Sequence, residues 1–258
     1  MHGPGGDCRM IELKANLSEN EWKQLHASFP EFRSQVVTIR HPGFPGGLWY
    51  LRLPEQIATD KDAKTGPYQA GMSWTRTMHG WKFAECPIVG LKGTAEATIS
   101  SSSADTIDFS MSVHNQSAVS WKRALAWLCF NHSHAMTYYR YRNFVCGDTG
   151  ILTTPPKAME HYCLPRHDRD WWTRGDIDPT APFIGTSCMA AESEEPFCVA
   201  IAAERAIMIG QNPGWPCTDI ALFFGDVAPG GTSATKGKIY FSKDKPEKVL
   251  ELYRQDFG

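Results

Sequence analysis

The sequence lacks both a long hydrophobic run and a strong net charge. No stretch of about 18 apolar residues occurs, so we expect no membrane span. The formal net charge is -2, without marked asymmetry along the 258 residues. A basic surface is the electrostatic feature that binds nucleic acid or an anionic membrane. We therefore expect neither a nucleic-acid nor a membrane partner, and the sequence leaves the oligomeric state open.

The first residues contain no apolar segment of the kind found in secretory signals, so we expect a cytoplasmic protein, with a mature secreted domain as the alternative. The eight cysteines are widely and irregularly spaced, and no C-x-x-C pair occurs. This spacing argues against zinc-ribbon and thioredoxin-like sites. We expect reduced thiols, with Cys129 and Cys198 as small core residues because both lie within apolar runs.

Several catalytic signatures are also missing. The sequence has no G-x-S-x-G, no phosphate-binding G-x-x-x-x-G-K-[ST] and no G-x-G-x-x-G. Their absence argues against α/β-hydrolases, nucleotide-driven enzymes and nicotinamide oxidoreductases.

The strongest positive signal is a strict alternation of apolar and polar residues. Ile107, Phe109, Met111 and Val113 alternate with polar residues, as expected for a strand with one buried face. Residues 95–100 lead into this strand through a polar segment, so the two should form a hairpin. Further strands are predicted within 36–39, 48–53, 72–93, 121–129 (buried on both faces), 140–145, 197–209, 220–224 and 235–241.

Breaks and caps complete the local predictions. Residues 55–71 read as a loop, and Glu204-Arg205 reads as the turn of a hairpin within 197–209. Ser18 should cap a short helix that ends before Pro30. A second helix should begin after Asp244, with Pro246 in its first turn.

Many short strands separated by turns, with helices only near the ends, predict one all-β domain over residues 1–258. The expected architecture is a two-sheet β-sandwich, and a jelly-roll or cupin-like barrel is the alternative.

His132 and His134 are the first candidate site. On a strand, residues two apart share a face, so both imidazoles could bind one metal ion or serve as acid and base. Further ligands would come from His114, His161 or His167. The alternative is that both are ordinary hydrogen-bonded residues at a strand end.

The pair resembles the His-x-His of cupins, and Pro229-Gly230-Gly231 resembles part of the second cupin motif. Two departures are evident, since residues 135–139 lack the expected glutamate and no histidine follows the glycines. The resemblance implies a metal-dependent oxygenase.

The second candidate is Tyr138 with Arg140 and Arg142, which could stack on a sugar ring and bind an anionic group. The alternative is a strand with aromatic cross-strand pairs and arginines exposed to solvent.

The third candidate is the loop at 161–174, where His161 or His167 could act as a base and Trp171 and Trp172 could stack on substrate. The alternative is a lid whose tryptophans cover the end of the sandwich.

A fourth set is Trp74, Arg76, His79 and Trp81, which could line a cleft or be ordinary sheet residues.

Three features together resemble a type of uncharacterised bacterial β-sandwich protein. They are the strand end Val113-His114-Asn115, the N-P-G-W-P-C loop at 212–217, and the A-P-G-G segment followed by G-K-I-Y-F before the last helix. The resemblance implies the fold and no particular reaction.

Together these residues favour an enzyme that acts on a carbohydrate or polyol by lyase or hydrolase chemistry. The alternatives are a non-catalytic saccharide-binding or assembly module and a cupin-like metal oxygenase. The sequence does not identify a cofactor, and the candidate is one divalent metal ion. The enzyme hypothesis predicts that His132, His134 and the 161–174 loop line one cavity.

Overall fold

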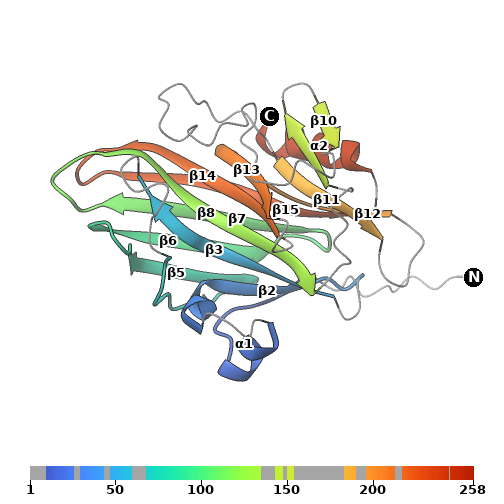
Figure 1. The fold of residues 1–258 in the computed structure, drawn as a ribbon, viewed down its shortest axis with the longest axis horizontal. Helices are drawn as coiled ribbons and strands as arrows, with labels where there is room; N and C mark the ends of the chain where they lie inside the picture. Colours follow the sequence, from blue (N-terminus) through green and yellow to red (C-terminus); the bar gives the residue numbers. More distant parts are fainter. Residues whose placement is uncertain are drawn as a thin grey trace, which may run out of the picture.

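The computed structural model describes residues 10–25, 30–43, 47–59, 68–134, 143–147, 150–153, 183–189, 196–212, 217–243 and 245–258, and for some of these, His134 among them, only the backbone. In these ranges the chain forms two antiparallel sheets that pack face to face (Figure 1). The predicted β-sandwich is therefore confirmed. None of the helices in the same ranges has the length and apolar character that crossing a membrane requires.

The smaller sheet, called sheet A, has six strands within the described residues. In spatial order they are β1 (Glu12–Lys14), β2 (Val36–Arg40), β3 (Leu48–Ala58), β8 (Trp121–His134), β14 (Cys217–Val227) and β13 (Ala206–Asn212). The larger one, sheet B, has nine strands over the same part of the chain. Their order is β10 (Gly150–Thr153), β9 (Asn143–Gly147), β11 (Phe183–Met189), β12 (Pro196–Ala203), β15 (Thr232–Ser242), β7 (Thr106–Asn115), β6 (Gly93–Ser101), β5 (Gly80–Pro87) and β4 (Thr75–Arg76).

The core lies between the two sheets and is built by the period-two alternation. In β7 every second residue is buried, as the alternation predicted, and β6 pairs with it as the predicted hairpin. Phe130 of β8 and Ile220 of β14 meet Ile107 and Ile239 of sheet B in one hydrophobic cluster. Successive strand residues point to opposite faces, so the alternate residues of β8 and β14 lie on the outer face of sheet A.

Helices cover part of the outer face of each sheet. Trp22 of α1 (Glu19–Leu25) and Phe32 of the 3-10 helix η1 (Pro30–Gln35) pack with Tyr50 of β3 on sheet A. Val249 of α2 (Pro246–Phe257) packs with Tyr240 on sheet B, and α2 contacts β10, β12 and β15 (Figure 1).

The predicted start of the first helix is confirmed. The Ser18 amide donates to Glu21 Oε2 at 2.9 Å and the Glu21 amide donates to Ser18 Oγ at 3.3 Å, which is a capping box.

The start of α2 differs from the prediction, because its N-cap is Lys245, without a side-chain cap, and Asp244 lies outside the described residues. Pro246 takes the predicted place in its first turn, where a proline costs no intrahelical hydrogen bond.

The predicted hairpin at 197–209 is wrong. β12 pairs in sheet B and β13 pairs in sheet A, so the short link between them crosses from one sheet to the other. The Glu204 amide donates to the Lys236 carbonyl of β15, and the Phe223 amide of β14 donates to the Arg205 carbonyl. A polar break in an apolar run marks a change of direction, and it does not specify which sheet the chain enters next.

Two strand boundaries also differ from the predictions. β3 continues to Ala58, so the first residues of the predicted 55–71 loop belong to a strand. β8 extends beyond Cys129 to His134. Of the strand predicted at 140–145, residues 140–142 lie outside the described residues and the rest belongs to β9.

Gly237 of β15 is closely packed, and Gly237→Ala should destabilise the protein. An added Cβ would lie 2.2 Å from Phe109 Cζ and 2.4 Å from the Ala202 carbonyl oxygen. The carbonyl belongs to a paired strand and cannot move without disturbing the ladder, so we expect a loss of about 1–3 kcal/mol in the free energy of unfolding. Urea unfolding followed by tryptophan fluorescence would measure it. The exposed neighbour Lys236→Ala is the control, and equal effects of the two changes would contradict the packing argument.

Candidate functional site

The outer face of sheet A holds two adjacent rows of polar and thiol side chains that lie in register across three strands. One row is Arg52 of β3, Cys129 of β8 and Asp219 of β14, and the other is Tyr50, Asn131 and Cys217 on the same three strands. All six residues are buried. A buried row of this composition is unusual for a sheet face, because polar groups are costly to bury unless they are paired. We call these six residues the polar grid.

A bulge in β3 brings Glu55 to the polar grid. In a regular strand, residues three apart point to opposite faces. The register between β3 and β8 shifts between Arg52 and Gln56, which inserts extra residues in β3. Such bulges redirect side chains. As a result Arg52 Nη1 donates to Glu55 Oε1 at 2.7 Å, in an ion pair whose side chains are only 5% and 20% exposed.

Arg52 is held on a second side by an aromatic ring. Its guanidinium carbon lies 4.5 Å from the centre of the Phe32 ring, within range of a cation–π interaction. The Arg52 Nε–H is buried and has no hydrogen-bond partner among the described residues. The ion pair and the cation–π contact therefore hold the Arg52 side chain in place, while its Nε–H remains available as a hydrogen-bond donor.

Tyr68 forms the exposed edge of this site. It bridges to Gln56 of β3, and its ring centre is 4.5 Å from that of Phe32. Tyr68 is 46% exposed, whereas the polar grid is buried. Burial, followed by the charge of Glu55, raises the pKa of Tyr68.

Burial also raises the pKa of Glu55, and the Arg52 charge opposes the rise. A glutamate shifted in this direction holds a proton closer to neutral pH than an exposed one does. This is the property required of a general acid or base.

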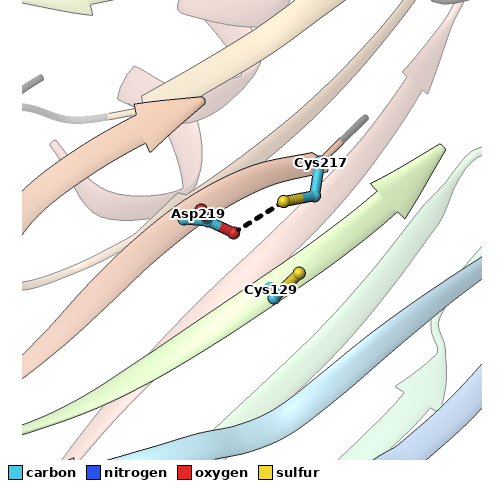
Figure 2. A group of neighbouring side chains, drawn as sticks. All are labelled: Cys129, Cys217 and Asp219. Carbon is cyan, nitrogen blue, oxygen red and sulfur yellow. Dashed lines mark hydrogen bonds between the residues drawn. The ribbon is translucent and has the colours of Figure 1, made fainter. Parts of the chain in front are cut away.

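Cys129, Cys217 and Asp219 lie together at the other end of the polar grid (Figure 2). Cys217 and Asp219 are two residues apart on β14 and so share a face, and Asp219 is directly opposite Cys129. The Cys217 thiol donates to Asp219 Oδ1 at 3.1 Å. Burial, followed by the charge of Glu55, raises the pKa of Asp219 to about 7.

Both thiols are stabilised in the neutral form. The hydrogen bond from Cys217 lowers the pKa of Cys129, but burial and the charge of Asp219 raise it to about 12. The hydrogen bond with Cys129 and burial raise the pKa of Cys217. Cys86 and Cys198 are likewise buried.

The predicted histidine pair is only half described. His132 is fully buried, and its ring lies against Phe130 with centres 4.8 Å apart and planes at 70°. Its Nε2 is 3.1 Å from Thr218 Oγ1. Because His132 follows Phe130 by two residues, it faces the inter-sheet core, on the opposite side of sheet A from Cys129. Its catalytic and metal-binding roles stay predictions.

Most other predicted site residues cannot be placed. His161, His167, Tyr138, Arg140, Arg142, Trp171 and Trp172 lie outside the described residues, and the side chain of His134 is not described. The predicted common cavity of the histidine pair and the 161–174 loop therefore stays a prediction.

The fourth predicted set divides into two parts. The Trp74 indole is buried and donates to the Ser34 carbonyl at 2.9 Å, so it serves the core. Arg76 and His79 line a pocket of about 310 Å³ at the β4 edge of sheet B, together with Trp81 and Glu12. The substrate-binding role predicted for this set stays a prediction.

Sequence reasoning missed the polar grid. Cys129 was interpreted as a core residue and Cys217 as part of a turn-rich loop. The spacing of Cys217 and Asp219 follows the same two-residue rule that drew attention to His132 and His134, so one signal was present. The alignment with Cys129 and Arg52 depends on strand pairing over long sequence separations, which no local pattern contains.

No protein-family model and no curated protein matches the sequence. Solved structures that resemble this chain include two candidate aldose 1-epimerases and one candidate kojibiose phosphorylase. A candidate aldose 1-epimerase from Escherichia coli K12 has 9% identity and a TM-score of 0.40, covering 81% of this chain and 96% of that one. A candidate kojibiose phosphorylase from the human microbiome has 8% identity and a TM-score of 0.38, covering 96% of this chain and 35% of that one.

The third is a candidate aldose 1-epimerase from Klebsiella pneumoniae subsp. pneumoniae, with 9% identity and a TM-score of 0.31, covering 83% of this chain and 58% of that one. This chain thus spans about a third of the second protein and somewhat more than half of the third. Similarities at these values do not transfer an activity to this chain.

Proposed function

We propose that this protein is a carbohydrate- or polyol-active enzyme with lyase or hydrolase chemistry, and that Glu55 is its acid–base residue. The observation that carries the proposal is a partly exposed carboxyl group with a raised pKa, fixed by Arg52, on the residue next to Gln56, which pairs with the exposed Tyr68. General acid–base catalysis needs a positioned group that exchanges a proton near working pH.

Each residue has a distinct role in this proposal. Glu55 accepts a proton from the substrate or from an attacking water molecule. The Tyr68 phenol donates a hydrogen bond or a proton to the leaving oxygen. Arg52 does not touch the substrate, because it is 4% exposed and already paired, and it orients the Glu55 carboxylate.

The substrate class follows from the surface that the site offers. The Tyr68 ring packs against Phe32, the residue is 46% exposed, and it pairs with Gln56, the neighbour of Glu55. Sugars and polyols offer both C–H faces that pack on aromatic rings and hydroxyls that bond to carboxylates. With a formal charge of -2, the chain has no strong electrostatic preference for a highly charged polymer.

Glu55→Gln should reduce activity at least about 100-fold, because the amide keeps the shape of the side chain but cannot exchange the proton. Purified protein would be assayed against a panel of glycosides, uronic-acid polymers and polyols, with kcat/KM measured on any substrate that is converted. Glu96→Gln is the matched control, since Glu96 is exposed on β6 of sheet B and should leave the rate unchanged.

Two outcomes would count against the enzyme. A substrate converted equally well by the Glu55→Gln variant would remove Glu55 from the chemistry. A saccharide that binds in calorimetry, is not altered, and loses affinity when Tyr68 is changed to Ala would favour a non-catalytic binding module.

A further inference from the structure

We propose that Cys129, Cys217 and Asp219 bind one zinc-class divalent ion through two thiolates and a carboxylate oxygen. The site lies on the outer face of sheet A, on the side away from His132. The proposal does not depend on the role of Glu55, and its experiment measures metal rather than activity.

The three ligand atoms are already close to the spacing that zinc requires. The two Sγ atoms and an Asp219 carboxylate oxygen all lie within 4.8 Å of one another, and Figure 2 shows them converging between β8 and β14. Tetrahedral zinc, with Zn–S near 2.3 Å and Zn–O near 2.0 Å, spaces its ligand atoms about 3.5–3.8 Å apart. Side-chain shifts of about 1 Å therefore suffice.

The strands supply a rigid frame for these ligands. Cys217 and Asp219 point the same way from one strand, and Cys129 is paired directly with Asp219 on the next. β8 and β14 are central strands of sheet A, with β3 and β13 on either side. Sites built on paired strands hold their ligands more precisely than sites on loops.

The donor atoms select the class of metal. Calcium and magnesium prefer ligand sets made only of oxygen, whereas thiolates favour zinc and other soft ions. On binding, two S–Zn bonds and one O–Zn bond form, and two thiol protons leave to solvent with no change in oxidation state. Three protein ligands leave one position open, the pattern of catalytic rather than structural zinc sites.

Arg52 is suited to support the site from outside. It is directly opposite Cys129 in register, and its buried Nε–H lacks a partner among the described residues. Two thiolates, one carboxylate and one divalent ion leave a single negative charge, which the Arg52 guanidinium, shared with Glu55, offsets in part. Ligands of metal ions commonly accept such outer hydrogen bonds.

The test is a zinc titration of the full chain after treatment with a chelator and a reductant. Inductively coupled plasma mass spectrometry after desalting should find about one zinc per chain. Substituting Co²⁺ should produce a thiolate-to-cobalt absorption band. Cys217→Ser and Asp219→Asn should each weaken zinc binding at least tenfold, while Cys198→Ala, at a buried cysteine of β12 in the other sheet, should bind as the parent does.

The parent protein alone can overturn the proposal, so a variant that fails to fold does not leave it undecided. Absence of a thiolate–cobalt band in the folded parent would refute it. Parent-like zinc affinity in folded Cys217→Ser would refute it too.

Discussion

Lowering the pH from about 7.5 to about 2 should remove about 5 kcal/mol from the free energy of unfolding through His132 alone. Complete burial lowers the pKa of His132 from 6.5 to about 3. Below pH 6.5 the unfolded chain therefore takes up a proton at this residue while the folded chain does not. The stability from the neutral imidazole is complete above pH 6.5, is lost as the pH falls, and levels off below pH 3.

The measurement compares the parent with His132→Gln by urea unfolding at several pH values. Other groups titrate over the same range, so the difference between the two pH profiles isolates His132. The glutamine amide can still bond to Thr218 but cannot be charged, so its profile should be flatter. His79→Gln, the same substitution at an exposed histidine, is the control. Parallel profiles for His132→Gln and the parent would contradict the prediction.

Arg52→Met should destabilise the protein by about 3–5 kcal/mol, because it leaves the largely buried Glu55 carboxylate without its counter-charge. Removing one partner of a buried ion pair costs far more than the net worth of the pair. The double variant Arg52→Met/Glu55→Gln should therefore recover part of the loss, and a double-mutant cycle in urea would measure the coupling.

An exposed ion pair serves as the comparison. Lys122 Nζ lies 2.6 Å from Asp226 Oδ2, but their side chains are 61% and 53% exposed. Water screens such a pair, so Lys122→Met should cost less than about 1 kcal/mol. If Arg52→Met cost no more than Lys122→Met, the buried pair would not contribute to stability as argued.

Local pattern was sufficient for elements whose physics is local. The alternation at 107–113 depends only on one face of a strand being buried, and β7 has that burial pattern. The capping box at Ser18 and Glu21 depends on atoms within one helical turn, and both of its hydrogen bonds form. Pro246 starts a helix because its missing N–H is not needed there.

Predictions failed where the outcome depended on a distant partner. The segment around Glu204 looks like a hairpin turn because the polar break is the same whether the chain returns to its own sheet or crosses to the other. The β3 bulge that joins Arg52 to Glu55 arises from pairing with β8, far along the chain. Neither interaction leaves a periodic trace in the sequence.

By itself the sequence determined that this chain forms many strands with one buried face each, and that common nucleotide and nucleophile motifs are absent. Only the tertiary structure decided which strands share a sheet, and hence that Arg52, Cys129 and Asp219 lie in one row. The physical reason is that side-chain alternation is a property of each strand alone. Register is a property of two strands, set by the hydrogen bonds and packing that they form only when folded together.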